Sequence, residues 1–272
     1  MLTAESYFRL IIDPPQDAAW NMAVDEALLD EAAARGVATL RFYQWSEPTL
    51  SLGYFQRAAD RRRHAASRDA ACVRRMSGGG AILHDRELTY SLALPASHPL
   101  ARHPTSLYGL VHRMLIDALA TFGVLLRRHG ESPEAMGGTY PVREIDAAIT
   151  ADDQPFLCFA SRSADDLVLA AAPSSALPAK IVGSAQRRRR GAVLQHGSVL
   201  LGRSKAAPEL PGIMDFGGLA VDRQALIQAC VAGLGERLAV DWQPAPIDGQ
   251  LAAAAAALRD KKYTALTWTE RR

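Results

Sequence analysis

Two side chains of this 272-residue chain are suited to nucleophilic chemistry, Cys158 and Lys180. Cys158 sits in the short apolar run 156–159, and Lys180 is one of four lysines in an arginine-rich chain. An ammonium close to a thiol favours the thiolate, which is the reactive form, and the same ammonium would stabilise an oxyanion. Two alternatives stay open: Cys158 as a buried apolar residue, and Lys180 as a charge that protects an edge strand.

The stretch 74–85, which reads RRMSGGGAILHD, is the second candidate site. Three consecutive glycines at 78–80 separate two strand-like runs, 71–76 and 88–94, which predicts a glycine-rich hairpin. Glycine allows positive φ and close approach of another molecule, so these N–H groups could face an acyl or phosphate oxygen. A turn or bulge without a ligand is the alternative. The stretch is neither a Walker A loop nor a G-x-G-x-x-G motif, because no Gly-Lys-Ser/Thr follows it and no helix-period run opens directly after it.

His84 and His196 each lie in a strand-turn context beside aspartate or glycine. Either one would allow a Cys–His dyad with Cys158, and hence a thiol hydrolase. Structural histidines that line a cavity are the alternative. The other two cysteines, Cys72 and Cys230, lie in a strand-like run and on a helix face, where we expect core positions.

The first predicted helix lies near the N-terminus. It begins behind Asp17 and ends at Gly36, with its apolar residues toward the core. Its acidic residues Glu26, Asp30 and Glu31 are expected to face solvent.

The stripe at 107–122 predicts the most regular helix of the chain, with Ser106 as its cap and Gly123 as its stop. This stripe is expected to be core. A third helix should follow Asp222, and the alanine-rich segment 251–262 predicts a fourth.

The remaining elements are strands and loops. We expect an irregular loop or insertion over the site at 130–155, a turn at 173–178, and a four-arginine turn at 187–190 that is either solvated or a docking patch for an acidic partner. Paired strands with long helices between them predict an α+β fold, with a mixed, largely antiparallel sheet flanked by helices. Strands are predicted at 40–43, 49–54, 71–76, 88–94, 124–128, 167–172, 180–185 and 192–201.

The composition is that of a globular protein, with 49% hydrophobic and 22% charged residues. A net charge of +2, with no aromatic residues among the clustered arginines, argues against nucleic acid as a partner. No apolar run is long enough for a membrane span, and the first ten residues lack a signal-peptide core, so we expect a cytoplasmic protein. The three cysteines give no metal-binding pattern. We expect a monomer with one domain over 1–272, in which 226–272 is a helical C-terminal extension.

The stretch 74–85 resembles the glycine-rich motif of the lipoate–protein ligase and octanoyltransferase superfamily, which shares its fold with biotin ligases. Three other segments are similar to this superfamily in the same order along the chain: NMAVDE at 21–26, KIVGSAQR at 180–187 and LQHGSVLL at 194–201. The resemblance implies a biotin/lipoate protein ligase-like catalytic domain.

Within the superfamily, the chain looks most like the cysteine-dependent octanoyltransferases, because LCF at 157–159 lies shortly before the lysine strand. That resemblance implies transfer of an octanoyl group from octanoyl-acyl carrier protein to a lysine of a lipoyl domain, through a Cys158 thioester. The acceptor would be a 2-oxoacid dehydrogenase or the glycine cleavage H protein. A thioester donor carries its own activation, so no ATP, metal or other cofactor is implied. The alternatives are an ATP-dependent lipoate–protein ligase, a lipoyl-protein amidotransferase, and a non-catalytic lipoyl-domain or acyl-carrier binding protein.

The resemblance also implies the site residues. Cys158 and Lys180 would be the catalytic pair, and basic turns near Arg187 would meet the acidic carrier protein. The implied substrate-binding residues are Arg75, Ser77, Gly78, Gly79, Gly80, His84, Gly183, Ser184, Ala185, His196 and Gly197.

Overall fold

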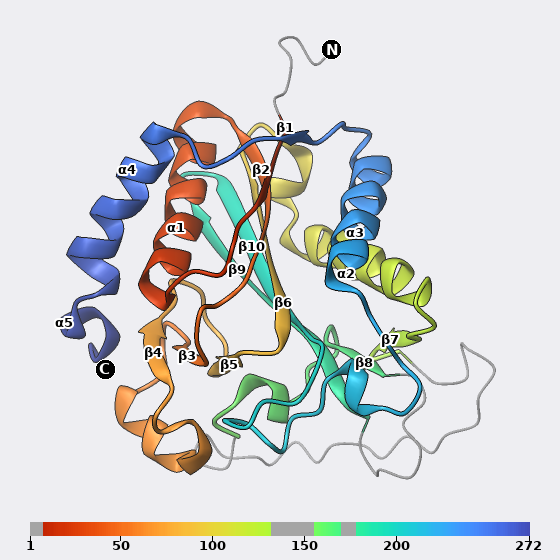
Figure 1. Ribbon diagram of the computed structural model, residues 1–272. Helices are drawn as coiled ribbons and strands as arrows, with labels where there is room; N and C mark the ends of the chain where they lie inside the picture. The colour runs from red at the N-terminus through yellow and green to blue at the C-terminus, as the bar shows by residue number, and fades with distance from the viewer. Residues whose placement is uncertain (1–7, 132–154, 170–177) are drawn as a thin grey trace.

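The computed structural model of the chain describes residues 8–131, 155–169 and 178–272. Most of the loop expected at 130–155 and nearly all of the turn expected at 173–178 lie outside the described residues. The described elements form a central sheet with helices on both faces (Figure 1).

The main sheet has eight strands in the order β11-β1-β2-β6-β10-β9-β8-β7. The pairs of β1 with β11 and with β2 are parallel, and all the other neighbours are antiparallel. The predicted mixed, largely antiparallel sheet is therefore confirmed. Its strands are β1 Phe8–Ile12, β2 Ala38–Tyr43, β6 Glu87–Leu94, β7 Leu126–Arg128, β8 Leu167–Leu169, β9 Lys180–Arg189, β10 Ala192–Leu200 and β11 Gln243–Pro244.

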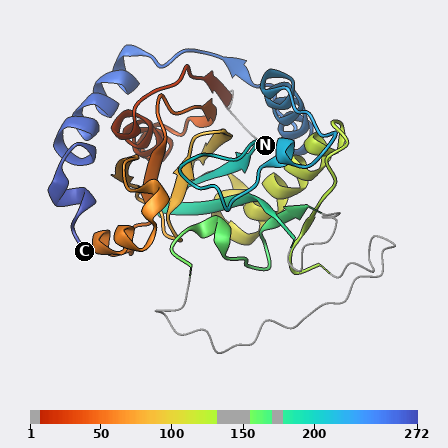
Figure 2. The ribbon, with the colours of Figure 1, turned by 60° about the horizontal axis from the view of Figure 1, so that its bottom comes forward.

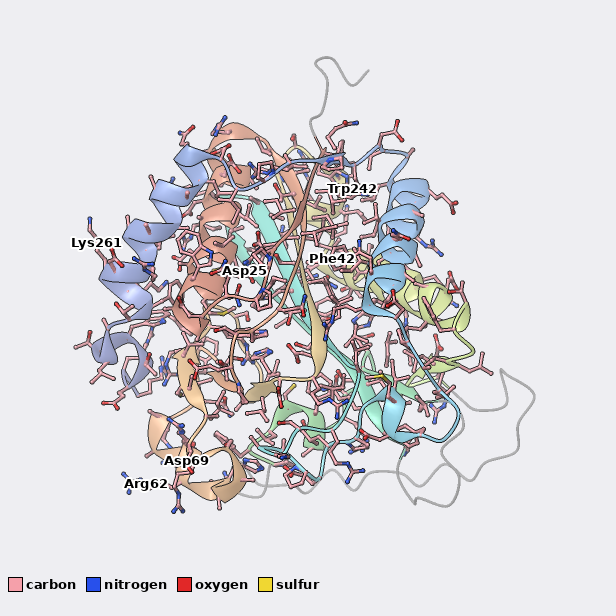
Figure 3. The ribbon with its side chains drawn as sticks, in the orientation of Figure 1. Asp25, Phe42, Arg62, Asp69, Trp242 and Lys261 are labelled. Atoms are coloured by element: carbon pink, nitrogen blue, oxygen red, sulfur yellow. The ribbon has the colours of Figure 1, made fainter. Side chains whose placement is uncertain are left out.

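Helices lie on both faces of this sheet. Helix α1 packs on one face, with the core around Met22 and Leu194, and α4 packs against the outer side of α1; α2 and α3 lie on the other face, with the core around Phe42 and Trp242 (Figures 2 and 3). Burial on both faces explains why all eight residues of β6 are buried although its sequence alternates. The helices are α1 Ala18–Arg35, α2 Pro104–Ala120, α3 Arg223–Leu238, α4 Gly249–Leu258 and α5 Leu266–Thr269, with short helical turns at Ala58–Arg63, Ala65–Ser67, Pro99–Arg102, Cys158–Ala160, Ile213–Asp215 and Arg259–Tyr263.

Helix α1 begins and ends as predicted, because Asp17 accepts from the backbone of Trp20 and Gly36 adopts a left-handed conformation. The expectation that its acidic residues face solvent was wrong for Glu26 and Glu31, which are largely buried, and right for Asp30, whose side chain is 42% exposed. Helix α4 and the turn after it pack over this face, so Glu26 is only 3% exposed. Its carboxylate accepts from Arg189, Lys262 and Tyr263.

Helix α2 starts earlier than predicted, at Pro104, and Ser106 lies inside its first turn rather than at its cap. Proline suits the first turn because its missing N–H would have no intrahelical partner there. The apolar stripe is core as expected, with Leu107, Val111 and Leu115 all buried.

The glycine stretch does not form a hairpin between its flanking runs, which corrects the prediction. The strand before it, β4 Ala71–Arg74, pairs with β3 Thr49–Leu52 in a separate three-stranded sheet, whereas β6 belongs to the main sheet. A short strand that the sequence did not suggest, β5 Ile82–His84, completes the small sheet. The glycines thus lie in the segment that joins β4 to β5 of the small sheet. After β5, the chain passes into β6 of the main sheet.

The four-arginine turn was also placed wrongly. Strand β9 runs through Arg189, and the turn consists of Arg190 and Gly191, which both have positive φ. The side chain of Arg189 pairs with Glu26 and Asp30, which extends the strand beyond its apolar part. Among the described residues, no helix is both long and apolar enough to cross a membrane.

Candidate active site

Cys158 is fixed against the glycine stretch by two backbone hydrogen bonds. Its N–H donates to the carbonyl of Ala81 at 2.7 Å, and the N–H of Ala81 donates to the carbonyl of Phe156 at 3.1 Å. The neighbours Leu157 and Phe159 are buried, which anchors the short turn that carries the cysteine. Gly80 lies so close that a Cβ there would be 3.1 Å from Cα of Cys158. Two segments far apart in sequence therefore meet at the sulfur.

Lys180 begins β9 and points at the same sulfur. Its Nζ lies 3.4 Å from Sγ of Cys158 and 3.2 Å from the carbonyl oxygen of that residue. The side chain is buried, and its countercharge is Asp166 at 2.8 Å. The structure thus brings together the predicted catalytic pair and adds a carboxylate that the sequence did not single out. An ammonium held by a carboxylate remains in place to stabilise negative charge on sulfur or oxygen.

Gly183 provides the space for this ammonium. A Cβ on Gly183 would lie 3.1 Å from Cε and 3.4 Å from Nζ of Lys180. The resemblance implied that Gly183 is a substrate-binding residue. In the structure, its missing side chain makes room for the Lys180 ammonium.

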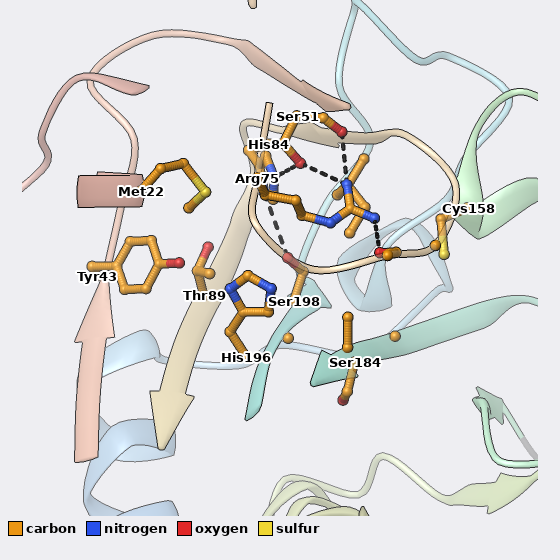
Figure 4. Close-up of a pocket in the computed structure, with 16 residues that line it drawn as sticks. Met22, Tyr43, Ser51, Arg75, His84, Thr89, Cys158, Ser184, His196 and Ser198 are labelled. Carbon is orange, nitrogen blue, oxygen red and sulfur yellow. Dashed lines mark hydrogen bonds between the residues drawn. The ribbon is translucent and has the colours of Figure 1, made fainter. Parts of the chain in front are cut away.

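Arg75 fixes the glycine stretch by hydrogen bonds to its carbonyl groups. Its guanidinium donates to the carbonyl of Gly78 at 2.7 Å and to the carbonyl of Ser51 at 2.8 Å (Figure 4). It also donates to the carbonyl of Gly80 at 2.7 Å. Burial lowers the pKa of Arg75 to about 10, whereas a negative charge on Cys158 acts in the opposite direction. The group therefore stays charged at neutral pH and is a second cation near the sulfur.

The carbonyls of Gly78 and Gly80 accept from Arg75, whereas the N–H groups of the glycine stretch have no partner of this kind. None of the backbone N–H groups of residues 78–80 donates to another residue within the described part of the chain. Gly79 has φ +91°, a conformation that glycine adopts without strain. Gly53 packs against Gly79 so tightly that a Cβ on Gly53 would lie 1.9 Å from the carbonyl oxygen of Gly79. The loop is consequently well fixed and presents unpaired donors.

His196 belongs to a buried hydrogen-bonded row of aspartate, histidine and serine. Its Nδ1 lies 2.9 Å from Oδ2 of Asp25, and its Nε2 lies 2.5 Å from Oγ of Ser77. Burial raises the pKa of Asp25, but the hydrogen bond with His196 and the charge of Arg41 outweigh it, so that the pKa lies below its ordinary value. The ionised carboxylate orients the imidazole, and the imidazole orients the serine before the glycines.

His84 forms a second row with different partners. Its Nδ1 lies 2.6 Å from Glu87, its Nε2 lies 2.7 Å from Oγ of Ser51, and its ring stacks on Trp45. Both ring nitrogens are therefore engaged. Since His196 is likewise engaged at both nitrogens, neither histidine makes a hydrogen bond with Cys158, and the Cys–His dyad considered from sequence does not form in this structure.

These groups surround one pocket (Figure 4). Cys158 lies at one end of it, and His196 and Tyr43 lie toward the other (Figure 4). Of the predicted site residues, those that line the pocket are Arg75, Gly78, Gly79, His84, Cys158, Gly183, Ser184, Ala185, His196 and Gly197. The other three predicted residues do not line the pocket but contact residues that do: Lys180 and Gly80 contact Cys158, and Ser77 contacts His196.

Sequence reasoning missed the pocket residues Met22, Tyr43, Ser51, Ile82, Thr89 and Ser198, and the acids Asp25, Glu87 and Asp166 that hold the site. The motif NMAVDE at 21–26 contained the signal for Met22 and Asp25. No cluster of histidine, cysteine, aspartate or glutamate side chains within the described ranges could hold a metal ion.

Ser184 is held from outside the pocket by His112, whose Nε2 lies 2.8 Å from its Oγ. Burial lowers the pKa of His112 from 6.5 to about 4. The unfolded chain therefore binds a proton between pH 6.5 and pH 4 that the folded chain does not, and stability falls as the pH falls through this window.

We expect acidification from pH 7.5 to pH 4 to remove about 3 kcal/mol of stability through His112. Urea unfolding at several pH values measures the slope. In His112→Gln, the stability lost between pH 7.5 and pH 4 should be smaller by about 3 kcal/mol than in wild type. The matched control is His103→Gln, because His103 is exposed, and its loss should equal that of wild type. Equal slopes in wild type and His112→Gln would contradict the assignment.

The chain is similar to known proteins in sequence and in fold. Residues 17–207 match the family model of the lipoyl protein ligase A/B catalytic domain. The chain is 32% identical to octanoyltransferase LipM of Kyrpidia tusciae, over 97% of this chain and 99% of that protein. It is 36% identical to octanoyltransferase LipM of Geobacillus kaustophilus, over 67% of this chain and 61% of that protein. The bipartite lipoate protein ligase of Thermoplasma acidophilum shares the fold, with a TM-score of 0.71 at 21% identity over 98% of this chain and 97% of its own.

Proposed function

The chain belongs to the lipoyl protein ligase A/B catalytic domain family, and we propose that it transfers an octanoyl group from acyl carrier protein to a lysine of a lipoyl domain. The octanoyltransferases among its relatives support this activity over that of an ATP-dependent ligase. The observation that carries the proposal is the 3.4 Å contact between Sγ of Cys158 and Nζ of Lys180 at the wall of the pocket. A ligase would have no need of a thiol beside a buried ammonium.

The first half of the proposed reaction forms an acyl-enzyme. The thiolate of Cys158 attacks the thioester carbonyl of the octanoyl-phosphopantetheine arm, and a new C–S bond forms. The oxyanion that develops lies within reach of Lys180 and the unpaired N–H groups of the glycine loop. The old C–S bond then breaks, and the phosphopantetheine sulfur leaves as a thiolate that takes up a proton.

The second half consumes the acyl-enzyme. The neutral ε-amine of a lipoyl-domain lysine attacks the acyl carbon of octanoyl-Cys158, a C–N bond forms, and the C–Sγ bond breaks. The amine nitrogen loses one proton, and Cys158 returns to its starting form. Because the thioester supplies the activation, the cycle needs neither ATP nor a metal.

The octanoyl chain would occupy the pocket away from the sulfur. Met22, Tyr43 and Ile82 supply apolar surface there. His196, held by Asp25, would keep Ser77 and the glycine loop in position rather than react itself.

A transfer assay onto an apo lipoyl domain tests the proposed function, with three donors run in parallel. We expect product from octanoyl-acyl carrier protein, and none from octanoate with ATP and magnesium. Product from octanoate and ATP only would assign the chain to the ligases. Product only from an octanoylated lipoyl protein would assign it to the amidotransferases, and free octanoate as the main product would indicate a thiol hydrolase.

Gly183→Ala should slow formation of the acyl-enzyme by about tenfold, because the added methyl group displaces the lysine ammonium from the sulfur. Single-turnover acylation of Cys158 measures the effect. Gly217→Ala is the matched control, since a Cβ on Gly217 would meet nothing within 4 Å. Equal acylation rates in Gly183→Ala and in wild type would show that the position of the ammonium does not matter.

A further inference from the structure

A cationic and aromatic surface adjoins the mouth of the pocket. It consists of Tyr54, Phe55, Arg187, Arg271 and Arg272, which we call the arginine–aromatic patch. The guanidinium carbons of Arg187 and Arg271 lie 5.3 and 4.1 Å from the centre of the Tyr54 ring, and that of Arg272 lies 5.3 Å from the centre of the Phe55 ring. Segments far apart in sequence thus contribute to one surface.

The patch is in direct contact with the glycine stretch. A Cβ on Gly78 would lie 3.8 Å from the ring of Phe55, so this ring packs beside the glycine stretch that lines the pocket. Phe55 is also 64% exposed, an unusual state for a phenylalanine beside a functional site. A molecule that rests on Phe55 would therefore have a short path to the pocket.

The patch is rigidly supported from below. Arg74 is fully buried and donates to the carbonyls of Gly53, Tyr54 and Gln56. The same guanidinium donates to the carbonyl of Thr269 in α5. One arginine thus joins the segment that carries Tyr54 and Phe55 to the segment that carries Arg271 and Arg272. Such fixed support is typical of a binding surface rather than of freely mobile side chains.

The positive charges of the patch are not neutralised within the described part of the chain. Arg187, Arg271 and Arg272 form no ion pair with a carboxylate there, unlike Arg189, which pairs with Glu26 and Asp30. The Nε of Arg187 is buried and has no hydrogen-bond partner. A hydrogen bond from Arg271, and the charges of all three arginines, hold the pKa of the Tyr54 phenol below its ordinary value. An anionic partner is the natural complement.

We propose that the arginine–aromatic patch binds the phosphate of the phosphopantetheine arm of the acyl donor, an inference that rests on the proposed function. The donor arm carries a phosphate, which arginine forks recognise well. The acceptor arm is a lysine side chain, whose positive charge three unpaired arginines would repel. The charge of the patch therefore selects the donor over the acceptor.

The test compares three donors of the same octanoyl group: octanoyl-acyl carrier protein, octanoyl-phosphopantetheine and octanoyl-pantetheine. Acylation of Cys158 is followed by intact mass in single turnover. In wild type, kcat/KM for octanoyl-phosphopantetheine should exceed that for octanoyl-pantetheine by at least tenfold. In the double variant Arg187→Gln/Arg271→Gln, this ratio should fall to near one, and acylation from the carrier protein should lose at least tenfold and most of its salt dependence.

Arg113→Gln is the matched control, because Arg113 is exposed on α2, across the sheet from α1 and α4. It should keep the wild-type ratio. Octanoyl-pantetheine shows whether the double variant is folded and active. An unchanged ratio in an active double variant would overturn the proposal, as would loss of the second half-reaction alone, which would make the patch an acceptor site. If wild type forms no acyl-enzyme from any donor, the proposed function itself fails.

Discussion

Replacing Cys158 by alanine should abolish octanoyl transfer, with a fall in kcat of at least about 1000-fold. The reason is that no other thiol can replace it. Burial raises the pKa of Cys72 and raises that of Cys230 to about 12, so both remain thiols at neutral pH. Cys158 is the cysteine that touches an ammonium. Steady-state transfer from octanoyl-acyl carrier protein to an apo lipoyl domain measures the loss.

The matched control for this substitution is Cys72→Ala. Cys72 lies half-buried in β4 of the small sheet, and its loss should change kcat less than about twofold. Transfer by Cys158→Ala at more than a few per cent of the wild-type rate would return Cys158 to the role of a packing residue. The reaction would then have to proceed by direct attack of the acceptor on the donor.

Replacing Lys180 by methionine has the second-largest expected effect, and it should act on both rate and stability. Acylation of Cys158 should slow by about 100-fold, because the ammonium no longer stabilises the thiolate and the oxyanion. The free energy of unfolding should fall by about 3 kcal/mol, because the carboxylate of Asp166 is left buried without its partner. Single-turnover acylation and urea unfolding measure the two effects separately.

The double variant Lys180→Met/Asp166→Asn separates chemistry from folding. Removing both charges should restore most of the lost stability, since no unpaired charge remains buried. The acylation rate should stay low, because stability does not replace the ammonium. Recovery of the rate together with stability would mean that Lys180 has a structural role only.

Elements with one dominant signal were predictable from the sequence. The cap at Asp17 and the left-handed Gly36 bound α1 as expected, and Leu226, Cys230 and Leu234 are buried on α3 behind Asp222. These features depend on neighbours within a few residues. The sequence contains that information directly.

Elements that depend on distant partners were not predictable in the same way. Glu26 was predicted to face solvent because no residue near it in the sequence indicates its partners. These partners are Arg189 and Lys262, which donate hydrogen bonds to its carboxylate. The glycine stretch was predicted to be a hairpin because the pairing of β4 with β3 is non-local. Local patterns give the period of an element but not the identity of its partner.

The candidate site shows the same division. The glycines and Lys180 were identified from motifs, and the structure brings them to Cys158. Asp166, which pairs with the lysine, gave no sequence signal because adjacent acidic residues before a short strand, here Asp165 and Asp166, are usually solvated. Supporting charges of this kind emerge only when the fold places them beside a buried partner.

The most direct test of the thioester mechanism is the mass of the wild-type protein after mixing with octanoyl-acyl carrier protein. We expect a single octanoyl adduct on Cys158 that is absent from Cys158→Ala. This adduct should disappear when an apo lipoyl domain is added and should yield octanoyl-lipoyl domain in equal amount. An adduct of equal size on Cys158→Ala would contradict the assignment of the nucleophile. A wild-type protein that forms no adduct, yet octanoylates the lipoyl domain, would contradict the thioester mechanism.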